Sequence, residues 1–241
     1  MKTRNIRIRI ISGVVLTIAA LTIFVASCKK EDNTTTDKVY AADAKVGGKA
    51  NAQWAAEWWK WNLQFDCANF PIRDTTGAKE NQNQSGSVYF LAGRRGYTLS
   101  VTVPAGVSIF LPLITFESDY PCASDPSSQP AQGETVEHFL TTMTQGSVDA
   151  MDQLSLTIDG DSISNVGSYE FISPMFDMSA NADLANCFDD CISGTTQSFV
   201  GGGYFFMLKP LSKGTHTIHR VGGASSLFPF LYDITYNVTQ L

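Results

Sequence analysis

Cysteines are the residues of this chain with the most evident chemistry. Four of the five lie in the main body of the chain, namely Cys67, Cys122, Cys187 and Cys191. A zinc site is not expected, because no further cysteine or histidine lies close in sequence to Cys187 and Cys191. In an exported chain, an even number of cysteines predicts two disulfides. Three connectivities are possible, and the preferred one joins Cys67 to Cys122 and Cys187 to Cys191.

Histidine is the side chain that most often acts as a general base near neutral pH, and this chain has three. His216 and His219 lie three residues apart on a predicted strand, so they point to opposite faces and do not share one ion. His138 falls on a predicted helix. No Gly-x-Ser-x-Gly nucleophile motif occurs in the chain. We therefore expect a structural role for each histidine and assign no catalytic residue.

Acidic side chains gather in two predicted loops: Glu117, Asp119 and Asp125 in one, and Asp189 and Asp190 in the other. Such groups bind calcium in some exported β-proteins, but neither loop follows the EF-hand spacing. Solvated loops are the favoured interpretation, so neither a metal nor another cofactor is expected. A pair of glycosidase carboxylates depends on spatial separation, and the sequence leaves that alternative open.

Tryptophans mark the clearest helix, predicted over residues 51–66. Trp54, Trp58, Trp61 and Phe65 recur at helical spacing, which predicts one buried face against a sheet. Trp59 lies off this face. It is therefore the candidate for stacking on a ligand such as a sugar, since aromatic rings offer large apolar contact faces.

Most of the chain is predicted to form strands, which would position the residues described above. Residues 87–92, 97–103 and 107–116 predict three consecutive strands of one sheet, separated by glycine- and proline-containing turns. Further short strands are predicted between residues 154 and 239, and a second amphipathic helix over residues 134–144. This pattern predicts an all-β fold, an antiparallel β-sandwich or jelly roll with one or two short amphipathic helices packed on it.

The N-terminal segment predicts export. Residues 1–27 combine a basic start with an apolar run too short for a membrane span of about 20 residues, as in a signal peptide. Residues 25–28 resemble the lipobox of bacterial lipoproteins, which implies cleavage before Cys28 and its lipidation. Residues 28–50 then predict a lipidated tether, and residues 51–241 a single β-sandwich domain. The charged residues 29–32 resemble the tag that directs some lipoproteins to the outer surface of the outer membrane.

The charge of the chain argues against one class of partner. The formal net charge is −6, and residues 1–27 contain four basic and no acidic residues, so the remainder is still more acidic. No cluster of Lys and Arg follows the signal segment. We therefore expect no nucleic-acid partner.

The chain contains ten short motifs in a fixed order. This set resembles the motifs of a family of secreted bacterial proteins of uncharacterised function. The resemblance covers residues 54–241. Its members often carry cysteines at the positions of Lys79 and Val101, and this chain lacks both. The resemblance implies no catalytic residues. The motifs are WWKW (58–61), DTTGA (74–78), QSGSVYFLAG (84–93), VPAG (103–106), IDG (158–160), SPMF (173–176), GY (203–204), LKPL (208–211), GTHTI (214–218) and VT (238–239).

Together these observations predict an exported lipoprotein, anchored by lipid in the outer membrane and exposed on the cell surface. The expected role is non-enzymatic binding of an extracellular glycan or another ligand. The alternatives are a hydrolase of envelope polysaccharide and a structural subunit of a surface assembly, whose partner would be an envelope protein. An open aromatic groove would favour binding, two carboxylates across a cleft would favour hydrolysis, and a flat apolar patch would favour assembly.

Overall fold

The computed structural model describes residues 38–227 and 231–241. The predicted signal peptide, Cys28 and the first part of the predicted tether lie outside the described residues. The described residues all belong to one compact unit. None of the helices within them is long and apolar enough to cross a membrane.

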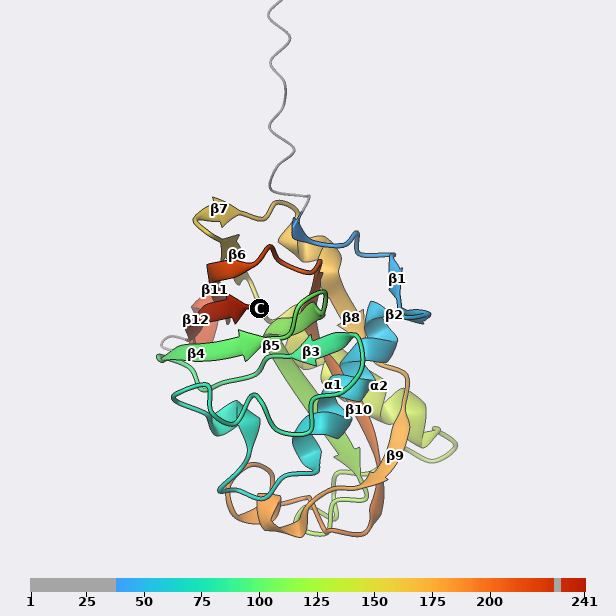
Figure 1. The fold of residues 1–241 in the computed structure, drawn as a ribbon. Helices are drawn as coiled ribbons and strands as arrows, with labels where there is room; N and C mark the ends of the chain where they lie inside the picture. Colours follow the sequence, from blue (N-terminus) through green and yellow to red (C-terminus); the bar gives the residue numbers. More distant parts are fainter. Residues whose placement is uncertain (1–37, 228–230) are drawn as a thin grey trace, which may run out of the picture. The chain divides into compact units, whose positions relative to one another are not determined.

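Two five-stranded sheets form the framework of this unit (Figure 1). The first sheet contains β3 (Val88–Phe90), β5 (Ser108–Tyr120), β10 (Thr196–Leu208), β8 (Glu170–Ile172) and β9 (Phe176–Ser179). The second contains β4 (Thr98–Val103), β12 (Leu231–Gln240), β11 (Gly214–Gly223), β6 (Gln153–Ile158) and β7 (Asp161–Ser162). A small hairpin joins β1 (Lys45–Val46) to β2 (Lys49–Ala50). Short 3₁₀ helices span Pro71–Arg73, Val166–Tyr169, Ala182–Asn186 and Ser225–Leu227.

Strand pairing is mixed in both sheets, so the predicted all-antiparallel arrangement is wrong. β3 runs parallel to β5, and β4 runs parallel to β12. The three strands predicted within residues 87–116 also do not share one sheet, because β4 belongs to the second sheet. The physical reason is the path of the chain. Since β4 carries the chain back within the second sheet, β3 and β5 both enter the first sheet from the same end.

Burial along the strands follows from these positions. β4 alternates exposed and buried residues, because it lies at the edge of the second sheet with one face toward the core. β5 is buried over most of its length, as expected for a strand covered on both faces. One buried cluster combines residues of both sheets, including Leu99, Leu111 and Ile218. The mostly β character predicted from the sequence is thus confirmed.

Two helices cover opposite faces of the first sheet. α1 spans Asn51–Leu63 and α2 spans Val136–Asp149, close to the predicted helices. A Cβ built on Gly201 would meet Trp59 of α1, whereas a Cβ built on Gly202 would meet Thr144 of α2. Because successive strand residues point to opposite faces, the two helices lie on either side of β10. α1 buries Trp58 and other side chains in a second apolar cluster that includes Phe110, Phe199 and Phe205.

The folded unit begins earlier than residue 51, the predicted start of the domain. Val39 is buried and forms a β-bridge with Leu208. Tyr40 N donates to Met207 O at 2.9 Å, and Lys209 N donates to Lys38 O at 2.9 Å. Residues 38–40 therefore extend the sheet beside the end of β10.

Candidate functional site

Two disulfides hold the loops at one end of the first sheet. They join Cys67 to Cys187 and Cys122 to Cys191, with Cα–Cα distances of 6.0 and 4.4 Å. The prediction of two disulfides is confirmed, but the preferred pairing is wrong. The register of β5 and β10 explains why. Tyr120 pairs with Ser198, so the segments just beyond these two positions, which carry Cys122 and Cys191, are brought together.

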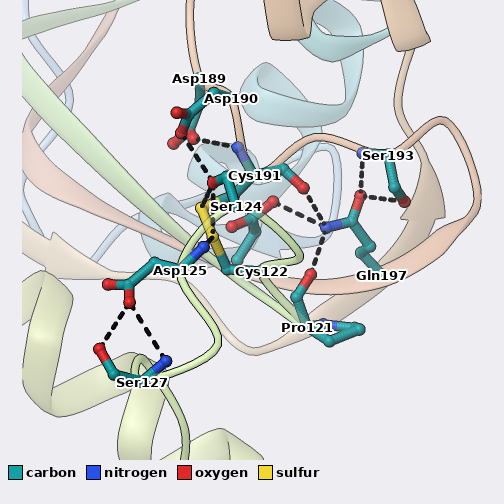
Figure 2. Close-up of a disulfide and its surroundings, with 11 residues drawn as sticks. Pro121, Cys122, Ser124, Asp125, Ser127, Asp189, Asp190, Cys191, Ser193 and Gln197 are labelled. Atoms are coloured by element: carbon teal, nitrogen blue, oxygen red, sulfur yellow. Dashed lines mark hydrogen bonds between the residues drawn. A yellow bond between two sulfur atoms is a disulfide. The ribbon is translucent and has the colours of Figure 1, made fainter.

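The loop between the two disulfides contains Phe188, Asp189 and Asp190. Figure 2 shows Asp189 and Asp190 beside the Cys122–Cys191 bridge. Ser124 Oγ donates to Asp190 Oδ1 at 3.0 Å, and Cys191 N donates to Asp189 Oδ1 at 2.9 Å. A disulfide at each end and hydrogen bonds between them restrain this loop.

Phe188 gives the loop an exposed aromatic surface. The residue is 36% exposed, which places it among the five exposed large apolar residues in the part of the chain that the structure describes. The ring rests on Phe70 and Trp59, with centroid distances of 5.0 and 6.0 Å. Residues 185–190 line an open depression of about 510 Å³, in which Asn186, Asp189 and Asp190 supply polar groups. An apolar ring beside amide and carboxylate groups can contact one face of a sugar and accept hydrogen bonds from its hydroxyls.

Trp59, the predicted stacking residue, is only 2% exposed. Its Nε1 donates to Thr115 Oγ1 at 3.1 Å, and its ring lies over Gly201. The predicted contact of this ring with a ligand does not fit the structure. The prediction failed because the spacing of the tryptophans indicates only one buried face of the helix. In the structure, α1 is covered on one side by the sheet and on another by the loop that carries Phe188.

An acidic centre lies beneath this loop. Glu117 and Asp119 are two residues apart on β5, so their side chains leave the same face of the strand. Carboxylate oxygens of Asp119 and Asp189 lie within 4.8 Å of each other and of Cys191 Sγ. Gln197 Nε2 donates to Asp119 Oδ2 at 3.0 Å. It also donates to Pro121 O at 2.8 Å and to Cys191 O at 2.9 Å, and these residues are labelled in Figure 2.

Burial raises the pKa values of Glu117 and Asp119 in this acidic centre. The residue Glu117 is partly exposed, but both of its carboxylate oxygens are buried and accept no hydrogen bond from the described residues. Burial, together with the charges of Asp119 and Asp189, raises the pKa of Glu117 well above its usual range. Burial and Asp189 raise the pKa of Asp119 to about 7, although its hydrogen bond with Gln197 opposes the shift.

The prediction of solvated acidic loops is therefore wrong for Glu117 and Asp119, whereas Asp125 and Asp190 are exposed as predicted. The error comes from the end of the strand. The sequence predicts that the strand stops at residue 116, but β5 continues to Tyr120 and carries both acids into the sheet. No alternation of apolar residues marks this extension.

The histidines have separate partners, in keeping with the predicted structural roles. His138 Nδ1 lies 2.6 Å from Glu134, and His219 Nε2 lies 2.8 Å from Asp233. His216 Nδ1 lies 2.9 Å from Asp159 Oδ2, which also pairs with Lys38 at 3.2 Å.

His216 also approaches Ser212, so that Ser212, His216 and Asp159 lie in the order of a catalytic triad. However, His216 Nε2 is 3.3 Å from Ser212 Oγ and only 2.9 Å from Ser212 O. With Nε2–H donating to the carbonyl, this nitrogen is not free to accept the serine proton. Burial opposes the charging of His216, but the hydrogen bonds with Asp159 and the carbonyl outweigh it and raise its pKa above the usual value. These interactions hold the turn that precedes β11.

Arg220 is a buried cation that the sequence did not indicate. It is 3% exposed, and Nε donates to the Tyr236 hydroxyl at 3.0 Å. Its other donors reach three backbone carbonyls, those of Pro112, Leu113 and Ala92, at 2.5, 2.8 and 2.8 Å. This residue lines a cavity of about 50 Å³ together with Phe188 and Trp59. The carbonyls satisfy the guanidinium, so Arg220 joins the two sheets.

No protein-family model matches this chain. No curated protein matches it either. The resemblance to secreted bacterial proteins therefore stays a prediction, and the functional proposal depends on the geometry described above.

Proposed function

We propose that the protein is an exported, lipid-anchored surface protein that binds an extracellular glycan through the loop at residues 185–190. The observation that carries this proposal is the exposed ring of Phe188, held between two disulfide-bonded cysteines within an open depression. A rigid aromatic surface of this kind loses little conformational freedom on binding.

Export is supported by the disulfides. Disulfides persist in oxidising compartments and are rare in the cytosol, and each of the four cysteines among the described residues is bridged. The lipobox sequence and the likeness to secreted bacterial proteins point the same way, and we propose that the chain belongs to that family. The lipid anchor would be Cys28, at the start of the predicted tether.

Recognition would combine stacking with hydrogen bonds. The face of Phe188 would contact the apolar face of a sugar ring, while Asn186 and Asp190 would contact its hydroxyls. Both polar side chains are exposed, so they reach a ligand without rearrangement of the loop. A single ring and a few polar groups give weak binding. Display of many copies on a cell surface would raise the effective affinity.

Hydrolysis is the second candidate, favoured by one observation. Glu117 and Asp119 have raised pKa values beside the charge of Asp189, and glycosidases use a protonated acid together with an ionised carboxylate. However, both oxygens of Glu117 are buried and Asp119 is 8% exposed. A polysaccharide would not reach both groups without displacement of the loop, so binding without turnover is the better proposal.

A glycan array probed with a multivalent form of the protein tests this proposal. Binding to a set of related glycans, with no release of reducing ends from them, would support it. Release of reducing ends would instead favour the hydrolase. Absence of any glycan binding, combined with specific capture of one envelope protein, would favour a structural subunit of a surface assembly.

A further inference from the structure

Glu117 carries a buried carboxylate for which the fold provides no partner. Both oxygens are buried and accept no hydrogen bond from residues 38–227 or 231–241. A buried ionised carboxylate without a partner is costly, and buried charges are normally paired or bound to a metal. The described side chains therefore supply neither a hydrogen-bond donor nor a cation to the Glu117 carboxylate.

The neighbours of Glu117 are also acidic, which makes an unpaired charge there still more costly. Asp119 shares the same face of β5, and a carboxylate oxygen of Asp189 lies within 4.8 Å of one of Asp119. None of the ion pairs among the described residues brings a Lys, Arg or His side chain to these three acids. Asp119 and Asp189 thus converge, with Glu117 on the same face of β5, and no described ion pair supplies a compensating cation.

We propose that Glu117, Asp119 and Asp189 bind one divalent cation, with calcium as the preferred ion. This site goes beyond the proposed glycan binding and does not depend on it. Oxygen donors from three carboxylates suit a hard cation, and calcium accepts six to eight oxygen ligands in flexible geometry. Cys191 Sγ lies within 4.8 Å of oxygens of Asp119 and Asp189, but it is bonded to Cys122, so it is not a thiolate ligand for zinc or copper.

The surrounding chain is already arranged to hold such an ion. Gln197 Nε2 fixes Asp119, and its Oε1 accepts from Ser193 N and Ser193 Oγ at 2.8 and 2.9 Å, which sets the orientation of the amide. The Cys122–Cys191 bridge links the segment after β5 to the loop that carries Asp189. A cation at this point would join β5 to the loop at residues 185–190 and stiffen that loop.

Calcium titration of the purified protein, followed by calorimetry and by thermal unfolding, tests the site. We expect one equivalent to bind, with a Kd on the order of 10⁻⁴ to 10⁻³ M as in other extracellular sites, and the Tm to rise with calcium. Glu117→Gln and Asp119→Asn should each weaken binding at least tenfold. Asp125→Asn is the matched control, because Asp125 is an exposed acid of the neighbouring loop whose carboxylate accepts from Ser127, and it should bind calcium like the wild type.

The unfolding data distinguish a lost site from a lost fold. Without calcium, Glu117→Gln should keep a Tm close to that of the wild type, because the amide has nearly the same shape and the carboxyl oxygens that it replaces make no hydrogen bond to lose. Adding calcium should then raise the Tm of the wild type and of Asp125→Asn, but not that of Glu117→Gln. Absence of calcium binding up to about 10 mM, well above the range for such sites, would overturn the proposal. So would wild-type binding by a folded Glu117→Gln variant.

Discussion

The indole of Trp59 lies directly against the backbone of Gly201. A Cβ built on Gly201 would stand 2.1 Å from Trp59 Cδ1 and 2.5 Å from Nε1, far inside any real contact distance. This contact lets α1 approach β10 closely, so that the indole also reaches Thr115 on β5. Glycine at position 201 is thus required by the close approach of an aromatic ring to the strand.

Substitution of this glycine should destabilise the fold. We expect Gly201→Ala to lower the free energy of unfolding by about 1–3 kcal/mol, the usual cost of overpacking a well-packed core. The control is Gly146→Ala in α2, where a Cβ would have no neighbour within 4 Å. That change should be neutral or stabilising by up to about 1 kcal/mol, because alanine favours helix. Urea unfolding measures both, and equal stability of the two variants would contradict the packing described here.

Local features of the fold could be predicted from the sequence, whereas its long-range pairings could not. The spacing of Trp54, Trp58 and Trp61 predicted α1, and the alternation in residues 97–103 predicted β4. Sheet membership depends on which distant strands meet, and β4 pairs with β12 at the other end of the chain. No local pattern encodes that choice.

The candidate site was predictable only in part, for the same reason. Both groups of acids were recognised, but their convergence depends on the pairing of β5 with β10 and on the continuation of β5 to Tyr120. Phe188 was missed. Phe188 lies between Cys187 and Cys191 in the sequence. That position indicates a restrained loop only once each of these cysteines is known to bond to a different distant cysteine.

Disulfide mapping tests the arrangement of these loops. Digestion of the unreduced protein and mass spectrometry should yield peptides that link Cys67 to Cys187 and Cys122 to Cys191. The Cys122→Ser and Cys191→Ser double variant should lose about 2–5 kcal/mol of stability, because the bridge restricts the unfolded chain. A peptide that links Cys67 to Cys122 would show that the loops are arranged differently.

The His216–Asp159 contact should make stability depend on pH. The folded-state pKa of His216 lies above the ordinary value of about 6.5. The protonated histidine therefore contributes stability that is fully present below about pH 6.5 and is lost as the pH rises through the folded-state pKa. The stability difference between wild type and His216→Asn should shrink over that range. Unfolding at a series of pH values measures it, with His138→Asn on the surface of α2 as control. A difference that stays constant from pH 5 to about pH 9 would contradict this role.

Lipidation of Cys28 is the prediction that concerns the segment before the described residues. Metabolic labelling with a fatty acid, followed by membrane fractionation, should show a labelled membrane protein in the wild type. The Cys28→Ala variant should lose the label and leave the membrane fraction. A label that persists in this variant would mean that the anchor lies elsewhere.

Comparison of two Phe188 variants in glycan binding tests the proposed binding loop most directly. Phe188→Ala and Phe188→Leu should each lower affinity for the bound glycan at least tenfold, or about 1.4 kcal/mol. Phe188→Leu keeps most of the apolar contact with Phe70 and Trp59, so its Tm should stay close to that of the wild type. The control is Tyr97→Ala, which removes another exposed ring, 43% exposed, and should bind normally. Wild-type affinity in both Phe188 variants would show that the loop between the disulfides is not the binding surface.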